Sequence, residues 1–324
     1  MPDGDSPARH CVIIPFLGRL EQVKRCLQAL LEQSLSRTQI LLINDGTPVS
    51  DVDNSLDNLL ENPAVHLVHH TANRGVSAAR NTAIQWCAER SVEIVLMIDS
   101  DCVPGSDFIA RHLALHQMYP AAACFGGGVI GVGQSFWATL DKVMSWVHSV
   151  PYGEIRPVHH PYHLPTTNFS VKMSALPESG PAFDARLLTG EDALLIRGFR
   201  RQGKPVLFSP DPVVYHHDRE SFTEVFRHHY VWGYHQYFIQ LNQDFAPRSF
   251  QPGYRALFLL AFIPCLPLFA LMGAVLNLKP WVRHKPGYLW LFPLVLLLWM
   301  GKGVAVAEAA LRPHRCLRES PPVM

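Results

Sequence analysis

The fold is decided by Val92–Pro104, VEIVLMIDSDCVP, in which an apolar run ends at two carboxylates. Apart from Glu93, every residue from Val92 to Ile98 is apolar. A continuous apolar run rich in β-branched residues is typical of a strand that is buried on both faces. In open α/β sheets, ligands bind at the carboxyl ends of such strands. Asp99 and Asp101 are therefore predicted to hold a divalent cation, Mn²⁺ or Mg²⁺, that binds a diphosphate.

An Asp-x-Asp pair alone is a weak signal, because acidic residues are common in surface turns. The chain contains a second such pair, Asp51 and Asp53, in a polar stretch with no strand before it. Only the pair that follows the apolar run is predicted to bind metal.

The composition argues against a general nucleic-acid binder, since 28 Lys and Arg against 27 Asp and Glu leave a formal charge of +1. The first nine residues are polar and the apolar run after them is only as long as a strand, so no signal peptide is expected. The seven cysteines form no Cys-x-x-Cys pair, which suits unpaired thiols in a reducing compartment.

Strand and helix patterns alternate through the first half of the chain, which predicts a mostly parallel, doubly wound α/β sheet. Strands are expected at 11–16, 40–43, 65–69 and 92–101, and helices at 19–34 and from Ser106, a plausible N-cap. Pro15 marks the end of the first strand, because proline cannot donate to a ladder.

Two polar residues of this half are candidate ligand contacts. Asp45 follows the second strand at a turn, where it either accepts hydrogen bonds from a nucleotide or caps its own backbone. Arg80 would lie one turn inside a helix that begins with small residues. It either reaches an anion or a carboxylate at the sheet edge, or it is solvated.

Four blocks of this region, in this order and spacing, resemble the nucleotide-binding half of the family-2 glycosyltransferases of the GT-A fold. The blocks are VIIPF, LINDG, NRGVSAARN and MIDSDCVP, and the resemblance covers about residues 10–220. It implies that Asp99 and Asp101 bind metal and sugar-nucleotide diphosphate, and that Asp45 contacts the nucleoside. Pro15, Arg80 and Asp99 are assigned with Asp45 to the donor side.

The acceptor side is expected further along the chain. Gly190-Glu191-Asp192 precedes a helical pattern and resembles the family block in which the Asp is the catalytic base. A helix N-terminus favours an ionised carboxylate, although a capping role is the alternative. Glu191 and Asn168 are assigned to the acceptor side. The family usually has an arginine where this chain has Gly198, and Arg197 or Arg200 is the candidate to replace it.

Histidines provide two further hypotheses. His216 ends a strand at the position where the family often has a histidine near the metal, and a buried structural histidine is the alternative. The loop histidines 159, 160 and 163 invite a metal site, but no cysteine or carboxylate pattern accompanies them, so contacts with the acceptor are the preferred interpretation.

The last third of the chain predicts membrane attachment. Aromatic residues at helical spacing over 222–241 favour a helix in the membrane interface, with a core helix as the alternative. Residues 256–278 and 288–311 are long enough to span a bilayer, the second interrupted by Lys302 and Glu308. Basic residues mildly favour cytoplasmic flanks, and Pro264 and Pro267 also permit a re-entrant pair.

The expected organisation is a GT-A domain over 10–220, an interfacial helix and linker over 221–252, two hydrophobic helices over 253–312 and a polar tail over 313–324. The resemblance implies a metal-dependent, inverting transferase that moves one sugar, since no Gln-x-x-Arg-Trp motif of processive enzymes is present. The expected donor is UDP-linked, and the expected acceptor is a lipid or polyprenyl-linked glycan of the cell envelope, reached from the cytoplasmic face of the membrane. A nucleotidyltransferase and a silent membrane-bound binding module are the alternatives.

Overall fold

The computed structural model describes residues 9–33, 36–149, 155–157, 164–242 and 245–318. The chain divides into two compact units that alternate along the sequence. We call them the sheet unit (Met1–Val129, Gly153–Ala185 and Leu195–His216) and the helical unit (Ile130–Tyr152, Arg186–Leu194 and His217–Met324).

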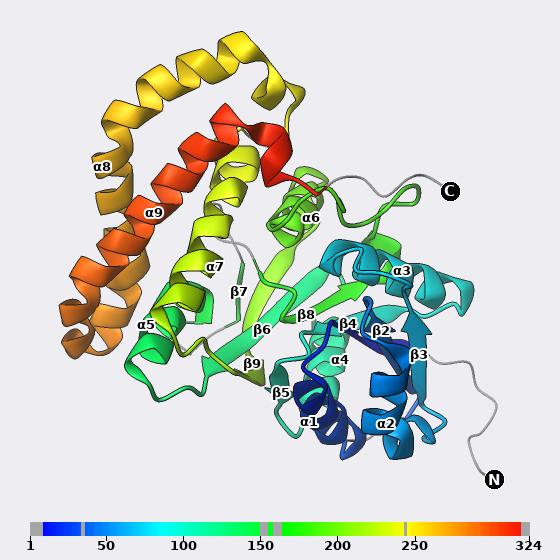
Figure 1. Cartoon of the computed structure of the whole chain (residues 1–324). Coiled ribbons are helices and arrows are strands. Elements are labelled where there is room, and N and C mark those ends of the chain that lie inside the picture. Colours follow the sequence, from blue (N-terminus) through cyan, green and yellow to red (C-terminus); the bar gives the residue numbers. More distant parts are fainter. Residues whose placement is uncertain (1–8, 34–35, 150–154, 158–163, 243–244, 319–324) are drawn as a thin grey trace. The chain divides into compact units, whose positions relative to one another are not determined.

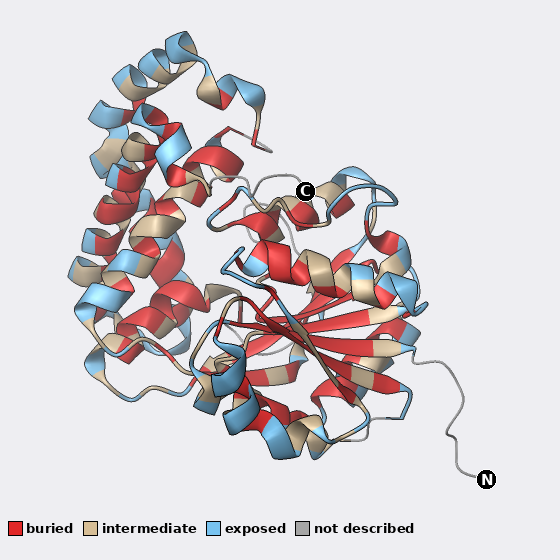
Figure 2. Ribbon diagram, turned by 45° about the vertical axis from the view of Figure 1, so that its right-hand side comes forward, coloured by how far each residue is buried: buried red, intermediate tan, exposed pale blue. Residues whose placement is uncertain are grey.

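The first half of the sheet is parallel, as the alternating pattern predicts. Its strands, in spatial order, are β3 (Val65–His69), β2 (Thr38–Asn44), β1 (His10–Phe16) and β4 (Ile94–Ile98). The crossovers are α1 (Leu20–Leu31), α2 (Val49–Leu60) and α3 (Val76–Glu89). Figure 1 shows α3 on one face of the sheet and α1 and α2 on the other. Because both faces are covered, β1, β2 and β4 are buried along most of their length (Figure 2), whereas only Val65 is buried in the edge strand β3.

The second half of the sheet is antiparallel, so the expectation of a mostly parallel sheet is wrong beyond β4. The further strands are β8 (Asn168–Lys172), β6 (Cys124–Gly131), β9 (Val206–His216), β5 (Cys102–Pro104) and β7 (Arg156–Pro157). β8 runs antiparallel to both β4 and β6, and β9 runs antiparallel to β5 and β7. The strand expected over 92–101 ends at Ile98, and the chain turns through Asp99–Asp101 before it enters β5.

The largest core cluster lies on one face of this sheet. It joins alternate strand residues, such as Ile13, Ile43 and Met97, with Ala79 and Ala83 of α3 and with Phe199 of α6 (Glu191–Arg201). Alternate residues of a strand point to the same face of the sheet, so a core on one face is expected to contain every second residue of each strand. On α4 (Phe108–Met118), Asp107 precedes the helix without a capping side-chain bond, and Ser106 is not the N-cap that was expected.

The helical unit contains α5 (Phe136–Ser145) and, in its C-terminal part, three further helices. They are α7 (Phe222–His235), which continues as a π-helical turn over Gln236–Leu241, α8 (Pro252–His284) and α9 (Phe292–Leu311). α9 packs against both α7 and α8. A side chain at Gly233 of α7 would collide with Ala305 and the Lys302 carbonyl of α9, so glycine permits this close approach.

The aromatic stripe of α7 is a packing surface. The hydroxyls of Tyr230 and Tyr234 donate to the Glu308 carboxylate of α9 at 2.8 and 2.9 Å. Tyr237 and Phe238, in the π-helical turn, are buried in a cluster with Val306 of α9. These contacts favour the alternative of a core helix for the part of α7 that faces α9. Phe222, at the start of the helix, is 37% exposed, and the interfacial helix stays a prediction.

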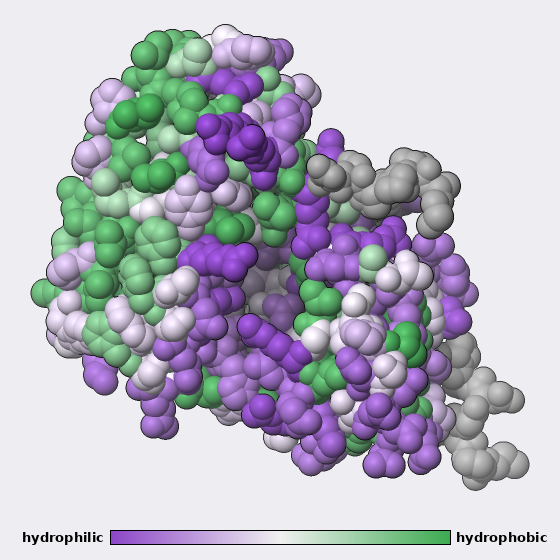
Figure 3. All heavy atoms as spheres, viewed as in Figure 1, coloured by the Kyte–Doolittle hydropathy of each residue, from purple (hydrophilic) through white to green (hydrophobic). Residues whose placement is uncertain are grey.

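Two segments, Pro252–His284 and Pro286–Leu311, are long and apolar enough to cross a membrane. Figure 3 shows hydrophobic residues gathered over α8 and α9. Leu257 and Leu260 of α8 are 68% and 75% exposed. α8 contains Pro264, Pro267 and Pro280, and it curves along its length in Figure 1. Proline removes a helical hydrogen bond and bends a helix, which explains the curve.

Candidate active site

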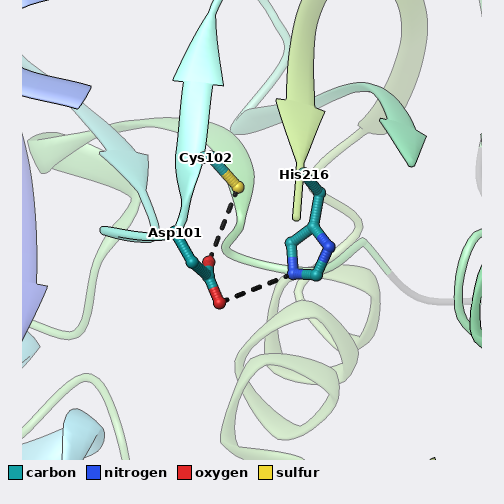
Figure 4. A group of neighbouring side chains, drawn as sticks. All are labelled: Asp101, Cys102 and His216. Carbon is teal, nitrogen blue, oxygen red and sulfur yellow. Dashed lines mark hydrogen bonds and ion pairs between the residues drawn. The ribbon is translucent and has the colours of Figure 1, made fainter. Parts of the chain in front are cut away.

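A carboxylate and an imidazole meet where β5 pairs with β9. The antiparallel register sets Cys102 opposite His216 and so brings the preceding residue, Asp101, near the histidine. The Oδ2 atom of Asp101 lies 3.6 Å from Nε2 of His216. Figure 4 shows both side chains and the Cys102 thiol pointing toward one another. One ligand atom from each of the three lies within 4.8 Å of the others.

Cys102 is a member of this trio that sequence reasoning missed. Its Sγ atom lies 3.8 Å from the Asp101 carboxylate. Burial raises the pKa of the Cys102 thiol well above its ordinary value, and the carboxylates of Asp101 and Asp99 raise it further. A protonated thiol is a poor metal ligand. The donor atoms suited to a hard cation are therefore the Asp101 oxygens and the His216 nitrogen, a set that fits Mn²⁺.

Asp99 is not a member of this trio, and its carboxylate has two hydrogen-bond partners. Nη2 of Arg80 donates to its Oδ1 atom at 2.9 Å, and the Thr167 hydroxyl donates to its Oδ2 atom at 2.6 Å. Arg80 is buried on α3, where its guanidinium also lies 5.7 Å from the centre of the Phe183 ring. Of the alternatives open for Arg80, the structure therefore shows contact with a carboxylate at the sheet edge.

Asp45 organises the loop before α3. Its carboxylate accepts hydrogen bonds from the backbone amides of Arg74 and Gly75 at 2.9 and 2.8 Å. Nδ1 of His70 lies 2.7 Å from the same carboxylate, and Nε2 of His70 lies 2.9 Å from the Thr82 hydroxyl. Asp45 is thus buried between the ends of two strands and the start of α3. Its hydrogen bonds join these elements and are not limited to its own turn.

Two other predicted site residues lie inside the sheet. Pro15 is buried in β1 opposite Ile43, one residue before the strand ends. Asn168 is fully buried at the start of β8. Its amide nitrogen donates to the carbonyls of Gly128 and Pro212, and its oxygen lies 2.9 Å from Nε2 of His112. The Asn168 side chain thus connects β8 with β6, β9 and α4 through hydrogen bonds. We therefore do not propose an acceptor role for Asn168.

Glu191 and Asp192 open α6, as the resemblance implies, and both belong to the helical unit. The Asp192 Oδ1 atom accepts a hydrogen bond from the Ala193 amide at 2.6 Å. Gly190 adopts a φ of +88°, and a Cβ there would lie 2.7 Å from the His235 ring. Only glycine therefore fits the turn that directs the two carboxylates. The loop histidines 159, 160 and 163 lie outside the described residues.

Residues 11–175 match the sequence model of the family "Glycosyl transferase family 2". An undecaprenyl-phosphate mannosyltransferase from Micrococcus luteus is 24% identical over 143 residues, which are 44% of this chain and 58% of that protein. A pre-mycofactocin glycosyltransferase from Mycobacterium tuberculosis is 24% identical over 69% of this chain and 46% of its own length. The chain thus spans about half the length of these relatives.

Solved structures show the same fold. A mannosyltransferase from Pyrobaculum calidifontis, in complex with GDP-Man and Mn²⁺, superposes with a TM-score of 0.60 at 18% identity. The superposition covers 97% of this chain and 91% of that one. GalNAc-T7, with UDP, GalNAc and Mn²⁺, gives a TM-score of 0.52 at 15% identity over 78% of this chain and 54% of that one. Both likenesses confirm the GT-A fold that the four sequence blocks predict.

Proposed function

The chain belongs to glycosyl transferase family 2, and we propose that it moves one sugar from a nucleotide sugar to an acceptor hydroxyl with inversion at the anomeric carbon. The observation that carries this proposal is the Asp101–His216 pair at the carboxyl edge of the sheet. The two solved relatives described above contain Mn²⁺. Membership of this family argues against a nucleotidyltransferase. The experiment described below separates an active transferase from a silent binding module.

We assign the donor to the residues gathered around β4. Asp101 and His216 would hold Mn²⁺ or Mg²⁺, which supplies charge neutralisation for the departing diphosphate. Asp99, fixed by Arg80 and Thr167, presents an ordered carboxylate beside this position. Asp45 and the loop it holds would contact the nucleoside. UDP is the proposed nucleotide, and GDP belongs in any test because one solved relative holds GDP-Man.

We assign the general base to Asp192. At the start of α6 the helix dipole stabilises its ionised form, which can accept a proton from the acceptor hydroxyl. The hydroxyl oxygen then attacks the anomeric carbon while the bond to the diphosphate breaks on the opposite side. The proton moves from the acceptor oxygen to Asp192, and the electron pair of the broken bond leaves with the diphosphate.

We propose a lipid or polyprenyl-linked acceptor, with the chain attached to a membrane and the transferase domain on its cytoplasmic side. Support comes from the exposed apolar residues of α8 and from the two segments long enough to span. One relative is named for undecaprenyl phosphate, which is consistent with this acceptor class.

The test uses the full chain in lipid nanodiscs with UDP- and GDP-sugars and measures nucleotide release with and without a polyprenyl phosphate. Release is expected with one donor, is lost in EDTA and is restored by Mn²⁺ or Mg²⁺. Asp101→Ala should abolish metal-dependent nucleotide binding, and Asp51→Ala, at the second Asp-x-Asp pair, should not. Equal calorimetric binding of nucleotide and metal to wild type and Asp101→Ala would show that this metal site is assigned wrongly.

A further inference from the structure

The start of α8 and the end of α9 lie at the same end of the helical unit (Figure 1). Four arginines gather there, and we call them the arginine rim: Arg248, Arg255, Arg312 and Arg315. Arg255 joins the two helices, because its Nε atom donates to the Ala310 carbonyl at 2.6 Å and its Nη2 atom donates to the Leu311 carbonyl. The rings of Phe250 and His314, 5.6 Å apart, bring together the short helical turns before α8 and after α9. The rim is thus one surface built from two segments that are far apart in the sequence.

The arginine rim carries positive charge that carboxylates do not balance. Arg248, Arg312 and Arg315 are exposed, and Arg255 is half-buried. Among the described residues, no acidic side chain lies within ion-pair distance of any of the four. Residues 244–255 and 309–319 together hold five arginines and two acidic residues, so the region is positive even when the acids outside the described residues are counted. A guanidinium has five N–H donors and no acceptor, so the rim can bind an external anion.

The arginine rim lies where apolar surface begins. The uncharged run 256–278 starts directly after Arg255, and Arg312 directly follows Leu311, which is 55% exposed. Both apolar segments are long enough to cross a bilayer. Residues at the ends of such segments lie near the lipid phosphates, which border a hydrocarbon core about 30 Å thick. The position of the rim thus matches the depth at which a membrane presents negative charge.

We propose that the arginine rim binds the phosphate groups of anionic phospholipids at the membrane surface. The inference rests on the membrane attachment proposed above and goes further, because it names the residues and the class of lipid. A planar guanidinium can donate two parallel hydrogen bonds to one phosphate. A zwitterionic lipid also has a phosphate, but its own ammonium balances the charge. An anionic lipid compensates the net charge of the rim, and basic clusters beside a membrane segment are attracted to such lipids.

The arginine rim adjoins the segment that carries the proposed general base. Leu187 forms a β-bridge with Leu317, and the Arg318 amide donates to the carbonyl of the residue before Leu187 at 2.9 Å. Residues 186–194, which include Asp192, belong to the same helical unit as the rim. Anionic lipid bound at the rim would therefore place the membrane surface near this segment, where a lipid-linked acceptor has to arrive.

The test measures which lipid associates with the full chain in a bilayer, and it does not depend on sugar transfer. The chain is reconstituted in phosphatidylcholine, and electron spin resonance of spin-labelled phosphatidylglycerol and phosphatidylcholine gives the fraction of each lipid that the protein immobilises. Wild type is expected to immobilise phosphatidylglycerol in preference to phosphatidylcholine. The preference should decline in high salt, because salt screens the attraction between exposed charges.

Variants then locate the lipid. Arg312→Gln with Arg315→Gln removes two exposed charges of the rim. The preference for phosphatidylglycerol should then fall by up to about fivefold for each charge removed, since each basic residue near an anionic leaflet contributes to the attraction. Arg312→Lys with Arg315→Lys keeps the charges and should retain most of the preference. Arg25→Gln with Arg37→Gln, which removes two exposed charges of the sheet unit, should leave it unchanged.

Two results would overturn the arginine rim alone. One is wild type that immobilises both lipids equally. The other is an unchanged preference in Arg312→Gln with Arg315→Gln, and its loss instead in Arg283→Gln with Lys285→Gln would assign the lipid to the other end of α8. Wild type that immobilises neither lipid would refute membrane attachment and the rim together. If the Arg312 and Arg315 variant does not fold, Arg248→Gln provides the same comparison.

Discussion

Asp192 separates an enzyme from a binding module, because its proposed work is confined to proton transfer. Asp192→Asn preserves shape but cannot accept a proton, so the loss should fall on kcat. General-base catalysis contributes about 10²–10⁴-fold, or roughly 3–5 kcal/mol of the barrier. Nucleotide Kd should change little. The measurements are kcat, nucleotide Kd and a thermal melt.

Glu191→Gln is the matched control for this change. Glu191 is buried beside Asp192 at the same helix start, so it experiences the same turn and helix dipole. The substitution should affect turnover less or act on acceptor affinity. A variant Asp192→Asn that turns over within a few-fold of wild type, or that loses nucleotide binding instead of rate, would remove Asp192 from the role of base.

Thr167 should matter for donor binding because its hydroxyl fixes the carboxylate of Asp99. Thr167→Val keeps the shape of the side chain and removes the hydroxyl that donates to Asp99. A hydrogen bond to a charged group is worth about 1.5–3 kcal/mol, so nucleotide affinity should fall by roughly tenfold or more. Thr167→Ser should retain it. The measurement is the nucleotide Kd by calorimetry in the presence of Mn²⁺. Equal affinities for wild type and Thr167→Val would contradict a donor-side role for the Asp99 carboxylate.

The sequence predicts the residues of this edge better than it predicts their partners. Asp45, Asp101 and His216 lie at or directly after recognisable strand ends, and Arg80 lies one turn inside the helix that follows β3. Their location at this edge therefore follows from the order of strands and helices. Thr167 and Cys102 were missed, because their contacts depend on the antiparallel register of β8 and β5. Asn168 was assigned to the acceptor side from its position before a strand. In the structure it is fully buried and its side chain hydrogen-bonds within the sheet unit.

At the scale of elements, the pairing of α7 with α9 depends on one carboxylate. Glu308 accepts from both Tyr230 and Tyr234. The double change Tyr230→Phe and Tyr234→Phe keeps the rings and leaves Glu308 without these donors, which should cost about 1–3 kcal/mol or more for a charged group. The expected result is a lower Tm in detergent.

Adding Glu308→Gln to that double variant should restore part of the loss, since a neutral amide is cheaper to leave unpaired. If the three proteins melt together, the carboxylate does not stabilise the helix pair. The same pair shows what the sequence cannot specify about α7. Aromatic spacing identifies a face to be covered, but it does not say whether lipid or another helix covers it.

At the scale of the molecule, buried neutral histidines should make stability pH-dependent. Burial lowers the pKa of His112 to about 3 and that of His116 to about 4. Because the folded pKa lies below the unfolded value of about 6.5, each contributes its full stability above that pH and loses it as the pH falls. At pH 5 the loss is about 2 kcal/mol for each. Melts from pH 7.5 to 5 should show it.

The check on this pH dependence is the double variant His112→Gln and His116→Gln. Glutamine can keep the hydrogen bonds toward Asn168 and Ser170 without a titrating ring. Its Tm should therefore fall less between pH 7.5 and 5 than that of wild type. Parallel curves for the two proteins would assign the acid sensitivity to other groups.

Membrane attachment involves the whole chain, and the exposed face of α8 offers a direct test. Leu257 and Leu260 are largely exposed, so replacing both with lysine removes no core contact. In a spanning helix each lysine costs about 2.5–3.5 kcal/mol of insertion free energy near the bilayer centre and less toward its surface. The double lysine variant should leave the membrane fraction during a high-salt wash that wild type survives. Glu61→Lys, at the exposed C-cap residue of α2, should remain with wild type. Sedimentation of the double lysine variant as complete as that of wild type would mean that this face does not lie in lipid. Full release of wild type by salt would point instead to attachment by charge, because apolar insertion is insensitive to ionic strength while the attraction of exposed basic residues to anionic headgroups is screened.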